Sequence, residues 1–210
     1  MIKLAKSFKN KLSTVVLFFE DSKAKDLDVS LPADYVALIN EYKTAKKCKE
    51  NSTKAIQLSP TADSNYLILI NLGKATEFTS KRLRSLSASA IRSLPNDAQA
   101  QWVAINGVDG WEWHVSQVIA MVQYEVPHSK SKSEPVKYSS HTFISTQKQS
   151  AQDGFYVGEA VNKARSFANL PANILTTTAF VSEIKTLLKG DKRYKVTVLN
   201  EAELKKKKML

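Results

Sequence analysis

Hydrophobic and polar positions follow two patterns along this chain: short continuous apolar runs, and longer stretches in which apolar residues recur every three to four positions. The short runs are rich in β-branched and aromatic residues and too brief for helices, which is typical of buried strands. They predict strands at residues 14–19, 54–58, 66–70, 102–105, 141–146 and 195–199. The periodic stretches predict amphipathic helices at residues 34–50, 80–94, 112–124, 151–168 and 176–189, and a helical turn at 201–204.

The pattern also predicts the surroundings of several elements. Residues 54–58 alternate weakly and residues 66–70 are continuously apolar, which predicts an edge strand beside a central one. Thr79 or Ser80 is a suitable N-cap for the next helix, and Gly190 suits the left-handed position after a helix. Apolar spacing also predicts which residues face inward in four of the helices, at 80–94, 112–124, 151–168 and 176–189. In that order, the inward residues are Leu83, Leu86, Ala90 and Leu94; Val115, Val118, Ile119 and Val122; Val157, Ala160, Val161 and Ala164; and Phe180, Ile184 and Leu187.

Strands that alternate with helices predict an α/β fold, in which a layered sheet with parallel or mixed pairing is flanked by helices. Residues 127–140 interrupt the alternation with five serines, two prolines and three lysines, which indicates an exposed loop or linker. We therefore predict an N-terminal α/β domain over residues 1–150, followed by a linker helix and a short α/β stub over residues 151–210.

Composition narrows the class of protein. The chain has 210 residues, 43% hydrophobic and 24% charged, with 6 Gly and 6 Pro, which suits a globular chain and not a fibrous or wholly disordered one. Its apolar runs are far shorter than the roughly 18 residues that cross a bilayer, so we expect no membrane span. Met1–Leu12 lacks the apolar region of a secretory signal, and the single Cys48 can form no internal disulfide. Both features fit a cytoplasmic protein.

The net charge of +11 is concentrated in the flanks, whereas residues 61–126 are close to neutral. A basic surface attracts polyanions and would support salt-sensitive contact with nucleic acid. Because most of the charges are isolated lysines, ordinary solubility explains them as well. The run Lys205–Lys208 has the same two interpretations, contact with nucleic acid or an acidic membrane, or an exposed terminus.

Candidate catalytic side chains are few. His114, His128 and His141 are dispersed and lack the spacing that places two imidazoles on one helix face for zinc, so we interpret them as surface or capping histidines. Cys48 lies among lysines that would lower its pKa and make it reactive, but no partner residue stands out and a bystander thiol is the simpler interpretation.

Two further groups have a possible ligand role beside a structural one. Gly73 follows an apolar strand, where backbone amides can meet a phosphate, but no glycine-rich phosphate motif surrounds it and a simple turn explains it. Trp111 and Trp113 would stack on a base or cover the sheet with aromatic bulk, and we favour the second. We assign no catalytic, metal-binding or cofactor-binding residue to this chain.

The most informative motifs lie in the last 60 residues. They are GEAVNKAR at 158–165, NLPANILT at 169–176, KVTVL at 195–199 and ELKKKKM at 203–209. In order and spacing they resemble the linker and early catalytic-domain segment of the leucine aminopeptidase, or cytosol aminopeptidase, family. Upstream, Leu69–Lys74 and the predicted helix over Lys81–Leu94 are similar to the N-terminal domain of that family.

The resemblance implies a macro-domain-like N-terminal domain, a linker helix and the start of a catalytic domain. Members of the family are exopeptidases in which two Zn or Mn ions activate a bridging water. Their metal-binding lysine, aspartates and glutamate, and the arginine that holds a bicarbonate base, come after the position that matches Met209. Arg165 and Asn169–Asn173 match the family only as linker architecture, with Pro171 fixing a structural turn.

We therefore expect the N-terminal portion of a cytosolic leucyl-type metalloaminopeptidase that is not catalytic by itself. One alternative is a basic module that binds nucleic acid or a nucleotide. Another is an assembly domain for aminopeptidase subunits, because the family forms hexamers.

Overall fold

The computed structural model describes residues 2–9, 12–22, 31–45, 47–58, 65–95, 97–105, 108–126 and 140–209. Its strands are β1 (Ile2–Ala5), β2 (Ser13–Phe18), β3 (Ser52–Gln57), β4 (Tyr66–Asn71), β5 (Gln99–Ala104) and β6 (Ser140–Ile144). Its helices are α1 (Ala33–Thr44), the 3-10 turn η2 (Ala75–Glu77), α2 (Ser80–Ser93), α3 (Trp111–Val122), α4 (Lys148–Asn169), α5 (Thr177–Leu187) and α6 (Glu201–Lys206). Two compact units contain them, residues 1–125 with 130–163 and residues 126–129 with 164–210.

The first unit is built on one mixed sheet with the strand order β1-β6-β5-β2-β4-β3. Every neighbouring pair is parallel except β3 and β4, which are antiparallel. This confirms the predicted α/β fold with a mixed sheet flanked by helices, and it confirms β3 as an edge strand beside the more central β4. The strand β1 was not predicted, because it has only four residues and Lys3 interrupts its apolar pattern. It pairs with β6 and is the strand at the other edge of the sheet.

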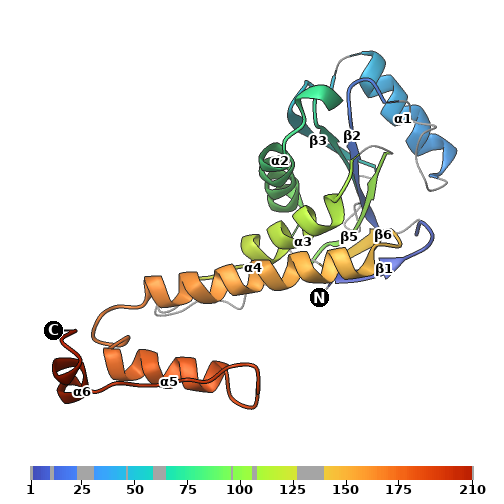
Figure 1. Cartoon of the computed structure of the whole chain (residues 1–210). Helices are drawn as coiled ribbons and strands as arrows, with labels where there is room; N and C mark the ends of the chain where they lie inside the picture. The colour runs from blue at the N-terminus through green and yellow to red at the C-terminus, as the bar shows by residue number, and fades with distance from the viewer. Residues whose placement is uncertain are drawn as a thin grey trace. The chain divides into compact units, whose positions relative to one another are not determined.

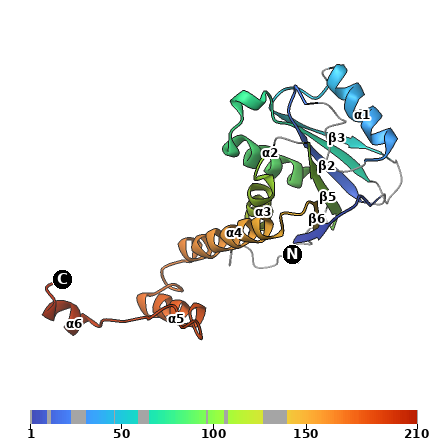
Figure 2. The same cartoon turned by 45° about the vertical axis from the view of Figure 1, so that its right-hand side comes forward.

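Helices cover both faces of this sheet, with α1 on one face and α2, α3 and α4 on the other (Figures 1 and 2). Alternate residues of β2 point to opposite faces of the sheet. Val15 and Leu17 pack in the cluster that contains residues of α2, α3 and α4, whereas Val16 and Phe18 pack with Ile39 of α1. A strand buried on both faces needs apolar side chains in both directions. This explains why β2 and β4 are continuous apolar runs in the sequence.

Local signals set several helix boundaries. The Thr79 side chain accepts a hydrogen bond from the Arg82 backbone N–H at 3.2 Å, which confirms the predicted N-cap of α2. Gly190 has φ of +86°, the predicted left-handed conformation after α5. The helix predicted over residues 34–50 is shorter than expected, because α1 ends at Thr44. The predicted loop over residues 127–140 lies outside the described residues except for Ser140, which begins β6.

The predicted inward face of α4 is wrong. Val157 is 39% exposed, and Ala160 and Ala164 are exposed as well, whereas the buried residues of the helix are Ala151, Gly154 and Gly158. The two glycines face the backbone of α3, and a Cβ atom built at Gly158 would lie 2.6 Å from the Gln117 carbonyl oxygen. The contact between α4 and α3 brings the two helix backbones close together, so it requires glycine, which has no side chain. The apolar residues that set the periodicity of the sequence are therefore not the ones that pack against α3.

The second unit contains α5, α6 and the end of α4. Phe180 of the predicted inner face of α5 packs edge-on against Phe167, with 5.3 Å between ring centroids, yet Phe180 and Leu187 remain well exposed. The strand predicted at residues 195–199 is wrong, since no described residue pairs with this segment and Val196 and Val198 are 39% and 43% exposed. An apolar alternating segment becomes a strand only where a neighbour supplies hydrogen bonds.

In the part of the chain that the structure describes, no helix is both long enough and apolar enough to cross a bilayer.

Candidate functional site

A cavity of about 730 Å³ lies at one edge of the sheet of the first unit. The strands β1, β5 and β6 are parallel, so their carboxyl ends meet at this edge. The cavity is lined by these strand ends, by Ile105 and Val108–Gly110 between β5 and α3, and by the segment that leads from β6 into α4. Crevices outside the carboxyl ends of parallel strands are where α/β folds commonly hold ligands.

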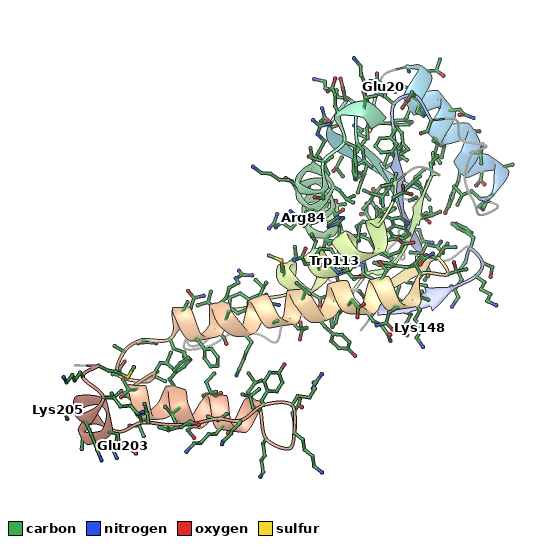
Figure 3. The ribbon with its side chains drawn as sticks, in the orientation of Figure 1. Glu20, Arg84, Trp113, Lys148, Glu203 and Lys205 are labelled. Carbon is green, nitrogen blue, oxygen red and sulfur yellow. The ribbon has the colours of Figure 1, made fainter. Side chains whose placement is uncertain are left out.

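Two helices begin at the cavity. Gly110 precedes α3 with φ of +67° and provides no side-chain cap, and Trp111 and Glu112 of the first turn line the cavity. The residues Gln147 and Ser150 at the start of α4 line it too, and both views show this end of α4 beside β1 and β6 (Figures 1 and 2). Figure 3 labels Lys148, the first residue of this helix. The first N–H groups of a helix have no partner within it, so both helices direct positive partial charge to this edge.

Glu112 is the buried charged side chain of the cavity, with 6% of its surface exposed. Its Oε1 accepts a hydrogen bond of 2.5 Å from the Ser145 hydroxyl, and the Ser145 Oγ accepts a bond of 3.0 Å from the Gln147 backbone N–H. This chain of bonds joins the start of α3 to the start of α4. The lining also carries one ammonium group, Lys6, and a second carboxylate, Asp109.

Trp111 was a candidate from the sequence, but none of the charged residues of the cavity was. Trp111 is buried, and its ring centroid lies 4.9 Å from that of Phe143, so it packs in the core as predicted. Trp113 lies outside the cavity lining and contacts the ring of His114 edge-on. The available signal for Glu112 was its position just after a strand and a glycine-containing turn, at the start of a helix.

The two described histidines lie on different elements, His114 on α3 and His141 on β6, and the predicted surface or capping position is wrong for His141, which is 1% exposed. His141 is buried in the sheet, where its Nδ1 accepts a hydrogen bond of 3.0 Å from the indole Nε1 of Trp102, and burial lowers the pKa of His141 to about 4. His114 lies on α3, and its Nδ1 is 3.2 Å from the Arg84 guanidinium of α2. Figure 3 shows Arg84 on α2 with α3 below it. Burial and this guanidinium lower the pKa of His114. His128 lies outside the described residues.

Cys48 differs from its predicted setting. It lies beyond the end of α1 and is buried, with its Sγ 3.9 Å from the Leu69 carbonyl oxygen. Burial raises the pKa of the Cys48 thiol, whereas the sequence suggested that neighbouring lysines would lower it. This favours the interpretation of a bystander thiol.

Gly73 lies in a turn after β4, which agrees with the simpler of its two interpretations. Its φ is +77°, its N–H donates to the Asn71 Oδ1 at 3.0 Å, and its carbonyl oxygen accepts from the Glu20 N–H. The backbone amide of Gly73 is thus already used within the fold. Glu20 is labelled in Figure 3.

The C-terminal candidates have structural partners. In Asn169–Asn173, the Pro171 carbonyl oxygen accepts N–H bonds from Ile174 and Leu175, which fits the predicted structural turn, and Arg165 lies on α4 before it. Lys205 and Lys206 end α6, where Lys205 pairs with Glu201 at 2.6 Å. Glu203 and Asn200 form a capping box at the start of that helix, and Figure 3 labels Glu203 and Lys205.

A two-metal site would need several carboxylates or imidazoles close together. Among the described residues, no group of three or more His, Cys, Asp or Glu side chains could hold a metal ion. The residues described here therefore do not fit the metal centre that the resemblance implies, and we derive no chemical step through one.

Comparison with known proteins identifies the class of protein. The family model described as the N-terminal domain of the cytosol aminopeptidase family matches residues 15–133. A curated relative, the probable cytosol aminopeptidase of Nitrosococcus oceani, is 26% identical over 173 residues, which are 70% of this chain and 33% of the relative.

Solved structures share the fold. Leucyl aminopeptidase from Trypanosoma brucei aligns with a TM-score of 0.68 and 13% identity over 98% of this chain and 44% of its own. Leucyl aminopeptidase from Leishmania major, in complex with actinonin, aligns with a TM-score of 0.67 and 14% identity over 98% of this chain and 42% of its own.

The chain belongs to the cytosol aminopeptidase family, and its first unit has the fold of the N-terminal domain. It spans about a third of the length of the curated relative and less than half of the two solved chains.

Proposed function

We propose that this chain supplies the N-terminal portion of a cytoplasmic leucyl-type metalloaminopeptidase and is not catalytic by itself. The observation that carries the proposal is the match of the N-terminal domain model to residues 15–133. Residues 151–210 are then the linker helix and the start of a catalytic domain, and the two Zn or Mn ions belong to a full-length enzyme. Hydrolysis of this type needs paired cations held by protein ligands, and the described residues offer no cluster of three or more suitable side chains.

The purified 210-residue chain, given Mn²⁺ or Zn²⁺, is expected to hydrolyse leucine p-nitroanilide no faster than the blank. A full-length member of the family, assayed in the same buffer and metals, is the positive control. Metal-dependent turnover that stays with the chain through a second purification step, and that a chelator abolishes, would show that the proposal is wrong.

The same proposal includes assembly with aminopeptidase polypeptides. The second unit supports it, because its described residues include no buried side chain while Leu187, Tyr194 and Met209 are more than half exposed. Removal of such apolar surface from water is favourable and is the dominant driving term in most protein–protein association. A tagged chain co-expressed with a full-length aminopeptidase of the family is expected to co-purify with it and to elute with it in size exclusion. Retention of the tagged chain as a separate species would contradict the assembly proposal and leave the family membership intact.

A further inference from the structure

The cavity at the carboxyl ends of β1, β5 and β6 has no part in the function proposed above. Its volume of about 730 Å³ lies within the range of roughly 300–1,000 Å³ in which proteins bind small molecules. We propose that it binds a zwitterion with a primary ammonium group and a carboxylate, that is, a free amino acid or a short peptide.

The negative group is the Glu112 carboxylate. Glu112 is buried and lines the cavity. A carboxylate offers about four lone-pair positions on two oxygens, and the Ser145 hydroxyl occupies one of them on Oε1. A buried charge is costly unless opposite charge or donors satisfy it. A primary ammonium brings both, with three N–H donors and a positive charge.

The positive groups lie at the start of α4 and at the end of β1. The Gln147 N–H donates to the Ser145 Oγ, the Lys148 N–H donates to the Thr146 carbonyl oxygen at 2.9 Å, and the Ala151 N–H donates to the Gln147 carbonyl oxygen. The remaining first-turn N–H groups, those of Gln149 and Ser150, lie at the helix N-terminus, where backbone N–H groups bind anions. The Lys6 ammonium follows β1 at the same cavity. A ligand carboxylate is suited to this side.

The balance of charge decides the class of ligand. The lining side chains comprise one cation, Lys6, and two anions, Asp109 and Glu112. Two helix N-termini add about half a positive charge each, so the lining is close to neutral. A nucleotide, with two or more negative charges, would meet a buried carboxylate that repels it. A zwitterion has matching charges at both ends, and the apolar side chains of Val103, Val108 and Trp111 in the lining suit an apolar ligand side chain.

The ligand class is tested with the full chain by isothermal titration calorimetry. L-leucine and the dipeptide Leu-Gly are the probes, with N-acetyl-leucine, which lacks the ammonium, leucinamide, which lacks the carboxylate, and AMP as comparisons. We expect leucine or Leu-Gly to bind, and each capped analogue of leucine to bind at least about tenfold more weakly, the usual loss when a charged hydrogen-bonding partner is removed. Absence of binding by both zwitterions at millimolar concentration, equal binding of the capped analogues, or tighter binding of AMP would each overturn the proposal.

Variants then locate the site. Glu112→Gln keeps the size of the side chain and an oxygen that can accept from Ser145, but it removes the charge. We expect it to weaken the binding of the zwitterion at least about tenfold and to leave the weak binding of N-acetyl-leucine unchanged. Glu159→Gln, on the exposed part of α4, is the matched control and should bind as the wild type does. Loss in both variants, or in neither, contradicts the placement.

Lys6→Gln keeps the experiment decisive if Glu112→Gln does not fold, as judged by circular dichroism. It is expected to weaken leucine and N-acetyl-leucine and to leave leucinamide unchanged, whereas an equal effect on all three would contradict the proposed orientation. None of these readouts depends on peptide hydrolysis, so failure of the binding proposal is distinguishable from failure of the proposed function.

Discussion

Gly154→Ala is expected to lower the free energy of unfolding of the first unit by about 3 kcal/mol, the upper part of the usual range for overpacking a well-packed interface. A Cβ atom at this position would collide with the carbonyl oxygen of Trp113 and with the backbone atoms beside it. Backbone cannot rotate away as a flexible side chain can, so α4 must shift from α3. Helix propensity alone predicts the opposite sign, because alanine is favoured over glycine in a helix interior by about 1 kcal/mol.

Urea denaturation of the full chain, followed by tryptophan fluorescence, measures this effect. Glu159→Ala changes an exposed residue of the same helix and is the control, with an expected change within about 0.5 kcal/mol. Gly158→Ala should be destabilising as well, since its added Cβ atom would lie 2.7 Å from the Ala120 Cβ. A Gly154→Ala variant as stable as the wild type would show that α3 and α4 do not pack backbone to backbone.

Acidification is expected to destabilise the first unit through His141. Burial holds the pKa of this imidazole at about 4 in the folded chain, against 6.5 for the ordinary group. Between these values the unfolded chain binds a proton that the folded chain does not, so stability is fully present above pH 6.5 and is lost as the pH falls toward 4. At about 1.4 kcal/mol per pKa unit, the loss is about 3 kcal/mol. Protonation would also break the hydrogen bond from Trp102, since the Nδ1 atom of His141 is its acceptor.

The contribution of His141 is isolated by comparison with His141→Asn, whose side-chain oxygen can still accept from the indole. Urea denaturation at pH 7 and at pH 4.5 should show a smaller pH-dependent loss in the variant than in the wild type, although the variant is less stable at neutral pH. Equal losses in both proteins would assign the acid sensitivity to other groups, His114 among them.

The central strands could be predicted from the sequence because burial on both faces leaves a direct mark on it. Every position of β2 is buried, so the run at residues 14–19 is unbroken and has no other plausible structure. The strand β1 left no such mark, since it lies at the sheet edge and only partly buries its four residues. Its place is set by pairing with β6, a long-range contact that local pattern does not contain.

The face of α4 could not be predicted by the same method. Hydrophobic periodicity counts side chains, and the true contact with α3 is made by Gly154 and Gly158, which have none. The competing outward stripe that begins at Val157 therefore gave the stronger signal. A pair of glycines four residues apart in a helix was the available indication of close helix packing.

The segment at residues 195–199 shows a different limit. Its alternation of Lys195, Val196, Thr197 and Val198 is a valid strand pattern, but strand formation depends on a partner that the described residues do not provide. The candidate cavity was missed for a related reason. Lys6, Glu112 and Ser145 are far apart in sequence and meet only because parallel strands place their carboxyl ends at the same edge.

The order of the strands has a consequence for synthesis of the chain. Of the six described strands, β1 comes first along the chain, and its hydrogen-bonding partner is β6, the last of the six; β1 forms the edge of the sheet beyond β6. On the ribosome, β1 must therefore wait until residue 144 and the following tunnel length of chain have been produced before it can join the sheet. Pairing of β1 with β6 closes a long loop, which costs conformational entropy and comes late. We infer that the sheet of the nascent domain forms first around β2 and β4 and that β1 joins it last.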